Sequence, residues 1–131
     1  MRTQFRIIKV IAAVLWLSII WGIRGVSDDV RVVFVLGFAP DFCAAIALFF
    51  DALDRNFGED GERVSRTRVR LTVAIGVIVL LFVGELLQEY VFWGSLDRWD
   101  IAAHFAGAVS AYGLSELLLR LHHRTPKGHP R

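Results

Sequence analysis

Four long runs of apolar residues, separated by charged segments, dominate the chain. They cover residues 7–23, 30–50, 71–92 and 101–121. An α-helix needs about 20 mainly apolar residues to cross a bilayer, and each run has or approaches that length. The helices of a soluble domain would instead mix polar positions among the apolar ones throughout. The pattern predicts an all-α, polytopic membrane protein with four transmembrane helices in two hairpins, all within a single domain of residues 1–131.

The first run is preceded by a basic segment, as in a secretory signal peptide. The run is long for the apolar part of a signal peptide, and the WGIRGVS segment offers no good small-x-small cleavage site. We therefore expect an uncleaved first helix. Lys9 lies near the beginning of this run, where a long side chain can extend to the membrane interface.

The basic residues are distributed unevenly between the segments that flank the runs. Three segments carry most of them: the amino terminus, the 51–70 loop and the 122–131 tail with the adjoining helix end. With four spans, these three segments fall on one side of the membrane, and basic residues favour the cytoplasmic side. We expect a multi-pass protein of the plasma membrane with both termini and the polar 51–70 linker in the cytoplasm. The basic residues concerned are Arg2, Arg6, Lys9, Arg55, Arg63, Arg66, Arg68, Arg70, Arg120, Arg124, Lys127 and Arg131.

Composition narrows the functional classes. Hydrophobic residues make up 55% of the 131 residues, and the formal net charge is only +2. The arginines are explained by topology, so we expect no nucleic-acid partner and take the lipid bilayer as the main surroundings. The lone cysteine, Cys43, excludes an intramolecular disulfide and a multi-cysteine metal site. We expect it to pack as a small apolar residue.

Ionisable residues interrupt the apolar pattern between residues 84 and 107. Glu85, Gln88 and Glu89 share one face of the third predicted helix, and Asp100 and His104 are i, i+4 neighbours on the fourth. The small residues of the fourth helix, Ala103, Gly107 and Ala111, allow another backbone to approach closely. We predict that the outer ends of these two helices face each other across a polar pocket. Within it, Glu85 and His104 are expected to be direct partners.

Asp41 lies near the middle of the second run, where a charge costs roughly 2.5–3.5 kcal/mol. Two interpretations are open: a protonated carboxyl that joins helices, or a member of the Glu85 and His104 site. Asp97 or Asp100 can cap the fourth helix, and Arg98 can pair with Glu89. Glu116 is expected near the cytoplasmic arginines. The candidate ligand-binding residues are Asp41, Glu85, Gln88, Glu89, Arg98, Asp100 and His104.

No motif in the sequence indicates an enzyme class, and no catalytic residue can be assigned. There is no Gly-x-Ser-x-Gly, no His-Glu-x-x-His and no phosphate-binding glycine loop. We expect no cofactor. If a divalent metal does bind, carboxylate and imidazole ligands suit it. The predicted set is Glu85, Glu89, Asp100 and His104.

The stretch from Glu85-Leu-Leu-Gln88 to Asp100-Ile-Ala-Ala-His104-Phe-Ala-Gly107-Ala108 resembles the carboxy-terminal half of VanZ-like membrane proteins. Those proteins have Glu-x-x-Gln at the end of one helix and Asp-x-x-x-Asn-x-x-Gly at the start of the next. The resemblance covers about 25 residues; His104 stands where asparagine is usual, and the family's Asp-Lys-x-x-His pattern is absent from the second run. It implies a small envelope protein.

Three functional classes follow from these observations. The first is a membrane protein whose outward-facing polar pocket binds a lipid headgroup or a cell-wall precursor. The second is a metal-dependent membrane hydrolase that uses Glu85, Asp100 and His104. The third is an accessory subunit whose partner is another membrane protein and whose polar residues only join helices. Metal content separates the second class from the others.

Overall fold

The computed structural model of the chain describes residues 2–20, 30–56, 66–92 and 98–124. These residues form four α-helices and no strand, which confirms the all-α prediction. Each helix covers most of one predicted apolar run, although residues 21–23 of the first run lie outside the described residues. The helices are α1 (Arg2–Ser18), α2 (Val30–Arg55), α4 (Thr67–Phe92) and α5 (Arg98–Arg124).

The predicted 51–70 linker is shorter than expected, because helices occupy both of its ends. α2 continues through Arg55, and α4 already begins at Thr67. Residues 51–55 contain no glycine or proline that would end a helix, so the loss of hydrophobicity after Phe50 does not stop α2. Asn56 then closes the helix, since its side-chain Nδ2 donates to the carbonyl of Ala52 at 2.8 Å.

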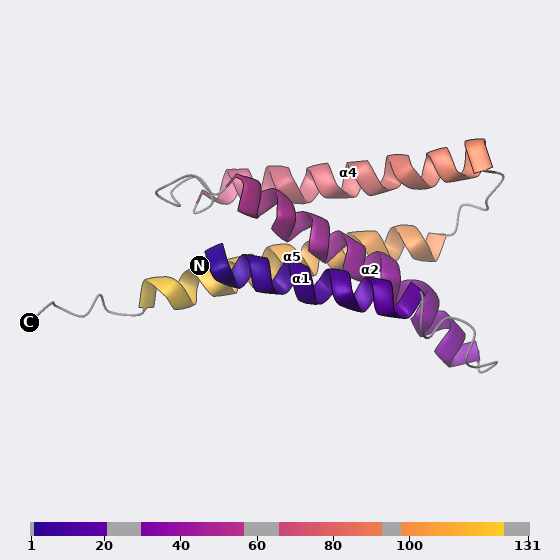
Figure 1. The fold of residues 1–131 in the computed structure, drawn as a ribbon. Coiled ribbons are helices and arrows are strands. Elements are labelled where there is room, and N and C mark those ends of the chain that lie inside the picture. Colours follow the sequence, from indigo (N-terminus) through magenta and orange to yellow (C-terminus); the bar gives the residue numbers. More distant parts are fainter. Residues whose placement is uncertain (1, 21–29, 57–65, 93–97, 125–131) are drawn as a thin grey trace, which may run out of the picture.

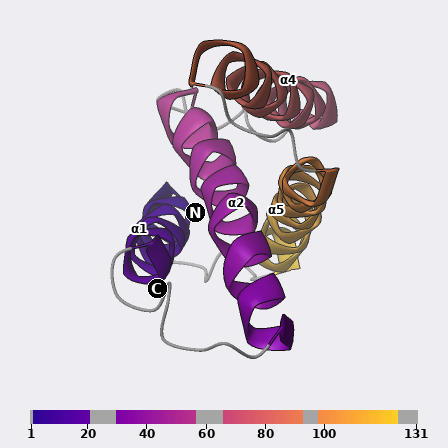
Figure 2. The same ribbon diagram turned by 90° about the vertical axis from the view of Figure 1, so that its right-hand side faces the viewer.

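The four helices alternate in direction along the bundle (Figure 1). α1 and α4 run away from the end that holds the amino terminus, and α2 and α5 run back toward it. α2 lies in the centre and packs against each of the other three helices (Figure 2). The basic segments at the start of α1, the end of α2, the start of α4 and the end of α5 therefore share one end of the bundle.

The hydrophobic core gathers around the second half of α2. Phe49, Phe50 and Leu53 are fully buried there, and Phe5 of α1 packs against Phe50 with ring centroids 5.3 Å apart. Ala74 and Val77 of α4 and Ala111 of α5 complete the cluster. Large aromatic side chains contribute most of the apolar area that such a core removes from solvent. The core thus lies toward the end of the bundle that carries the basic residues.

Among the described residues, α4 is the one helix that is long and apolar enough to cross a membrane, so the four-span arrangement remains a prediction. The stretch Thr67–Val91 has a mean hydropathy of 2.3, and only 11% of its most apolar part is buried inside the bundle. Large apolar side chains are also exposed along α1 and α5. They include Ile7, Val10, Ile11, Val14 and Leu15 on α1 and Phe105, Val109, Leu117 and Leu121 on α5.

Candidate functional site

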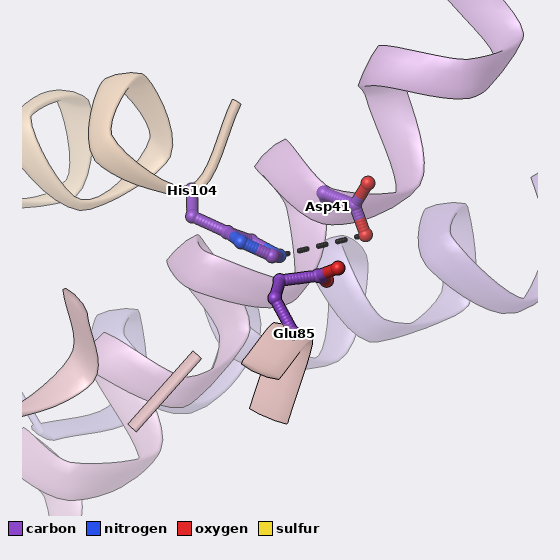
Figure 3. A group of neighbouring side chains, drawn as sticks. All are labelled: Asp41, Glu85 and His104. Atoms are coloured by element: carbon purple, nitrogen blue, oxygen red, sulfur yellow. Dashed lines mark ion pairs between the residues drawn. The ribbon is translucent and has the colours of Figure 1, made fainter. Parts of the chain in front are cut away.

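Three ionisable side chains from three helices come together and form what we call the α2–α4–α5 cluster. Asp41 comes from α2, Glu85 from α4 and His104 from α5, and the three side chains point toward one another (Figure 3). Glu85 lies late in α4 and His104 early in α5. Because of the directions of these helices, the cluster lies toward the end of the bundle opposite the amino terminus.

His104 is the most buried member of the cluster. It is 5% exposed, whereas the Asp41 side chain is 28% exposed and Glu85 is half-buried. Nε2 of His104 lies 3.5 Å from Oδ1 of Asp41, which is longer than the about 2.7–3.2 Å of an ordinary N–H···O hydrogen bond. One ligand atom of each residue lies within 4.8 Å of the other two.

One ring nitrogen of His104 lacks a hydrogen bond. Its Nδ1 is buried and has no hydrogen-bond partner among the residues that the structure describes. Buried polar atoms in proteins nearly always have such a partner, so an exception calls for an explanation. The histidine is therefore a buried polar group whose one resolved ionic contact, to Asp41, is long.

Gly107 holds α5 against α2 one turn beyond His104. A Cβ atom built on Gly107 would lie 2.6 Å from the Phe42 carbonyl oxygen and 2.8 Å from the Ala45 Cβ. The small-residue stripe therefore permits a close approach, as predicted, but its partner is α2. The stripe was expected to face α4, but at Gly107 the neighbouring helix is α2, while Ala111 of the same stripe belongs to the core cluster that includes Ala74 and Val77 of α4. The contact at Gly107 places His104 beside Asp41.

Asp41 and Glu85 are brought together with His104. The metal set predicted from the sequence is corrected: among the described residues, the group that could hold an ion includes Asp41 but neither Glu89 nor Asp100. Gln88 is exposed on α4. Asp100 lies in the first turn of α5, where the helix dipole stabilises a negatively charged carboxylate.

Arg98 is exposed at the first residue of α5, with its guanidinium carbon 5.9 Å from the centroid of the Trp99 ring. This distance suits a cation–π contact, and the structure resolves no ion pair between Arg98 and Glu89. Asp97, the other predicted cap, lies outside the described residues.

A second group of charges, the α1–α2 ion network, joins the basic face of α1 to the end of α2. Asp54, 7% exposed, accepts hydrogen bonds from Arg2 at 3.0 Å, Arg6 at 3.2 Å and Lys9 at 3.1 Å. Lys9 also donates to Asp51 at 2.9 Å. Lys9 therefore pairs with α2 instead of only extending toward an interface. Arg55 completes the network by donating to Asp51 at 2.7 Å.

The cations of this network lower the pKa of both aspartates below the ordinary value of 3.8. For Asp51 the main causes are the hydrogen bonds from Lys9 and Arg55. For Asp54 burial acts in the opposite direction and raises the pKa, but the hydrogen bonds from Arg2, Lys9 and Arg6 together outweigh it. Both carboxylates are therefore stabilised in their charged form.

A third polar contact joins α4 to α5. Arg70 is 2% exposed, and its Nη2 donates to Oε1 of Glu116 and to the Thr67 hydroxyl. The Tyr112 hydroxyl donates to the same Glu116 oxygen at 3.2 Å. The predicted proximity of Glu116 to the arginines is confirmed. Arg70 was expected in a solvated linker, and it is instead a buried ion-pair partner.

The networks that the sequence analysis missed have a recognisable spacing. Arg2, Arg6 and Lys9 follow each other at i, i+4 and i+7 and so share one helix face, and Asp51 and Asp54 are i, i+3 neighbours. Two complementary faces of this kind on consecutive helices indicate an ion network. Such a signal was available in the sequence.

The three clusters differ in their chemistry. In the α1–α2 ion network and at Arg70, cations face carboxylates directly. The α2–α4–α5 cluster has two carboxylates and one imidazole, and no Lys or Arg among the described residues forms an ion pair with any of the three. Oxygen and imidazole donors of this kind suit a cation, and they disfavour direct contact with an anion. No family model, no curated protein and no solved structure matches this chain.

Proposed function

We propose that this chain is an integral membrane protein that crosses the bilayer four times, with both termini in the cytoplasm, and binds a lipid headgroup or cell-envelope ligand at the α2–α4–α5 cluster. The observation that carries this proposal is the convergence of Asp41, Glu85 and His104 from three helices that are otherwise mainly apolar.

The distribution of exposed apolar side chains supports insertion into a bilayer. They are spread along α1, α4 and α5 and are not confined to one patch, as they would be at a single protein–protein interface. Apolar side chains exposed on several antiparallel helices match a hydrocarbon surrounding. The common end of the basic segments supports an orientation with that end in the cytoplasm.

The exposure of the cluster supports a binding role for it. His104 is its most buried member, while Asp41 and Glu85 remain partly accessible. Ionisable residues within membrane-spanning helices are costly and are kept mainly where they have a function. In the proposed orientation the cluster lies in the outer half of the membrane, within reach of lipid headgroups. The resemblance of residues 85–108 to VanZ-like proteins supports a role in the cell envelope.

Cysteine labelling tests the topology. In a Cys43→Ala background, Ser95→Cys should react with an impermeant maleimide added from outside, and Ser65→Cys should react only after the membrane is opened. Equal labelling of both positions from outside would contradict the proposed orientation.

Lipid binding tests the function. Detergent-purified protein titrated with short-chain phosphatidylethanolamine, whose ammonium group suits the two carboxylates, should be stabilised, because a ligand that binds only the folded state raises stability by RT ln(1 + [L]/Kd), about 2.7 kcal/mol at 100 times Kd. Glu85→Gln should remove most of the thermal shift. Glu89→Gln, on the same helix but outside the cluster, should keep it. An unchanged shift in Glu85→Gln would contradict the assignment of the site.

A further inference from the structure

We propose that the α2–α4–α5 cluster is a binding site for a first-row divalent metal ion, of which Zn²⁺ is the most suitable probe, held by Asp41, Glu85 and His104. The inference deepens the proposed function and rests on it for the location of the site in the membrane. The metal would supply the positive charge that this acidic group lacks.

The geometry of the Asp41–His104 pair favours a shared ion. The 3.5 Å between His104 Nε2 and Asp41 Oδ1 exceeds hydrogen-bond length. Bonds of about 2.0–2.1 Å to a tetrahedral Zn²⁺ place neighbouring ligand atoms about 3.4 Å apart. The observed separation is close to the spacing of two ligands on one ion.

Glu85 is placed to complete the set. All three ligand atoms lie within 4.8 Å of one another, which is wider than one edge of a tetrahedral site. Glu85 is half-buried and has three rotatable side-chain bonds, so it can move inward while the more buried His104 stays fixed. The ligands come from α2, α4 and α5, and a bound ion would therefore join three helices.

The state of His104 is the independent observation in favour of a ligand. The side chain is more than nine-tenths buried and directed into the cluster (Figure 3), and neither of its ring nitrogens makes a hydrogen bond within the described part of the chain. The nitrogen that faces the two carboxylates is Nε2, and its one resolved contact, to Asp41, is longer than a hydrogen bond. Coordination through one ring nitrogen accounts for a buried histidine directed at two carboxylates.

The donor set selects the class of metal. Imidazole nitrogen favours zinc and its first-row neighbours, while Mg²⁺ and Ca²⁺ prefer sites made only of oxygen. Three protein ligands leave one coordination position open. The partial exposure of Asp41 and Glu85 leaves that position accessible to water or to a phosphate oxygen of a headgroup. A metal would thus allow an acidic cluster to bind an anionic group.

Calorimetric titration of the chelator-treated full chain with Zn²⁺ tests the inference. The tail contains His122, His123 and His129, so the titration uses a background with all three replaced by alanine. One equivalent of Zn²⁺ should bind, and Mg²⁺ should bind far more weakly. Absence of Zn²⁺ binding, or equal affinity for the two ions, would overturn the inference.

Substitutions in this background locate the ion. His104→Gln, Asp41→Asn and Glu85→Gln should each weaken Zn²⁺ binding by about 100-fold or more, since even residues behind metal ligands contribute 10–100-fold. Glu89→Gln should bind Zn²⁺ like the background. Thermal unfolding without metal verifies that each variant is folded. The ion would be elsewhere if all three cluster variants kept the background affinity.

The lipid titration with and without chelator separates this inference from the proposed function. Stabilisation by phosphatidylglycerol that disappears with chelator and returns with Zn²⁺ supports both. Stabilisation that survives chelator treatment overturns the role of the metal in holding the headgroup and leaves lipid binding intact. Zn²⁺ binding in a protein that no lipid stabilises supports the metal and contradicts lipid binding.

Discussion

The two largest groups of charged side chains in this bundle are built in opposite ways. In the α1–α2 ion network, Asp54 and Asp51 accept hydrogen bonds from Arg2, Arg6, Lys9 and Arg55 at 2.7–3.2 Å. In the α2–α4–α5 cluster, the one resolved ion pair is 3.5 Å long and one ring nitrogen has no resolved partner. A satisfied network holds helices together, whereas an incomplete one has capacity left for a ligand.

The surroundings of the two groups reinforce this difference. The ion network adjoins the aromatic core formed by Phe5, Phe49 and Phe50, where packing already fixes α1 against α2. The cluster lies beyond that core and is positioned mainly by the close contact at Gly107. We therefore expect substitutions in the first group to affect stability and substitutions in the second to affect binding.

Gly107→Ala should have the largest effect on stability, a loss of about 3 kcal/mol, because the new methyl group meets a backbone carbonyl that cannot move alone. It should also separate His104 from Asp41 and abolish ligand binding. The matched control is Gly113→Ala on the same helix, which has nothing within 4 Å of the new Cβ. That variant should be neutral or slightly stabilised in denaturant unfolding, and equal losses in the two variants would contradict the close α2–α5 contact.

Asp54→Asn should destabilise the protein by about 2 kcal/mol, because three charge-assisted hydrogen bonds lose their anionic acceptor. The loss is moderated by solvent, since the Arg2 and Arg6 side chains are about half exposed. Unfolding of detergent-solubilised protein measures it. A loss below about 0.5 kcal/mol, the scatter expected of surface substitutions, would mean that the network does not hold α1 to α2.

Acid should weaken the same contact. The pKa values of Asp51 and Asp54 are lowered in the folded protein, so their stabilisation is complete above the unfolded pKa of about 3.9 and is lost as pH falls toward the lower folded values. The stability difference between wild type and Asp54→Asn should be constant from about pH 7 to pH 5 and shrink below about pH 4. A difference that shrinks already between pH 7 and pH 5 would exclude these carboxylates as its source.

Asp41→Asn should change stability least, by less than about 0.5 kcal/mol in the absence of ligand, because the long contact to His104 contributes little and the substitution relieves repulsion from Glu85. The comparison with Asp54→Asn is direct, since both variants remove one aspartate charge from α2. If Asp41→Asn lost as much unfolding free energy as Asp54→Asn, the cluster would serve to hold the helices together and not to bind a ligand.

The helices could be predicted from sequence because long apolar runs have few other structural solutions. Their ends cannot, because the loss of hydrophobicity after Phe50 predicts an end there, whereas α2 continues through Arg55. Asp54 and Arg70 were placed in a solvated linker on the same ground. Polarity predicts exposure only where no opposite charge faces the side chain from a neighbouring helix.

The candidate site was predictable in part. Glu85 and His104 were identified from their depth in apolar helices, and Asp41 remained open between two interpretations. Depth along a helix does not determine which neighbour its faces meet. The small residues around Gly107 indicated a close approach but not the identity of the approaching helix. The position of α2 between α1 and α5 therefore had to come from the structure.

Anomalous diffraction at the zinc edge, from crystals of the full chain grown with Zn²⁺, tests the central claim most directly. The account predicts a peak about 2.0–2.2 Å from His104 Nε2 and from one carboxylate oxygen each of Asp41 and Glu85. Peaks confined to the tail histidines or to the α1–α2 ion network, with none at His104, would contradict it.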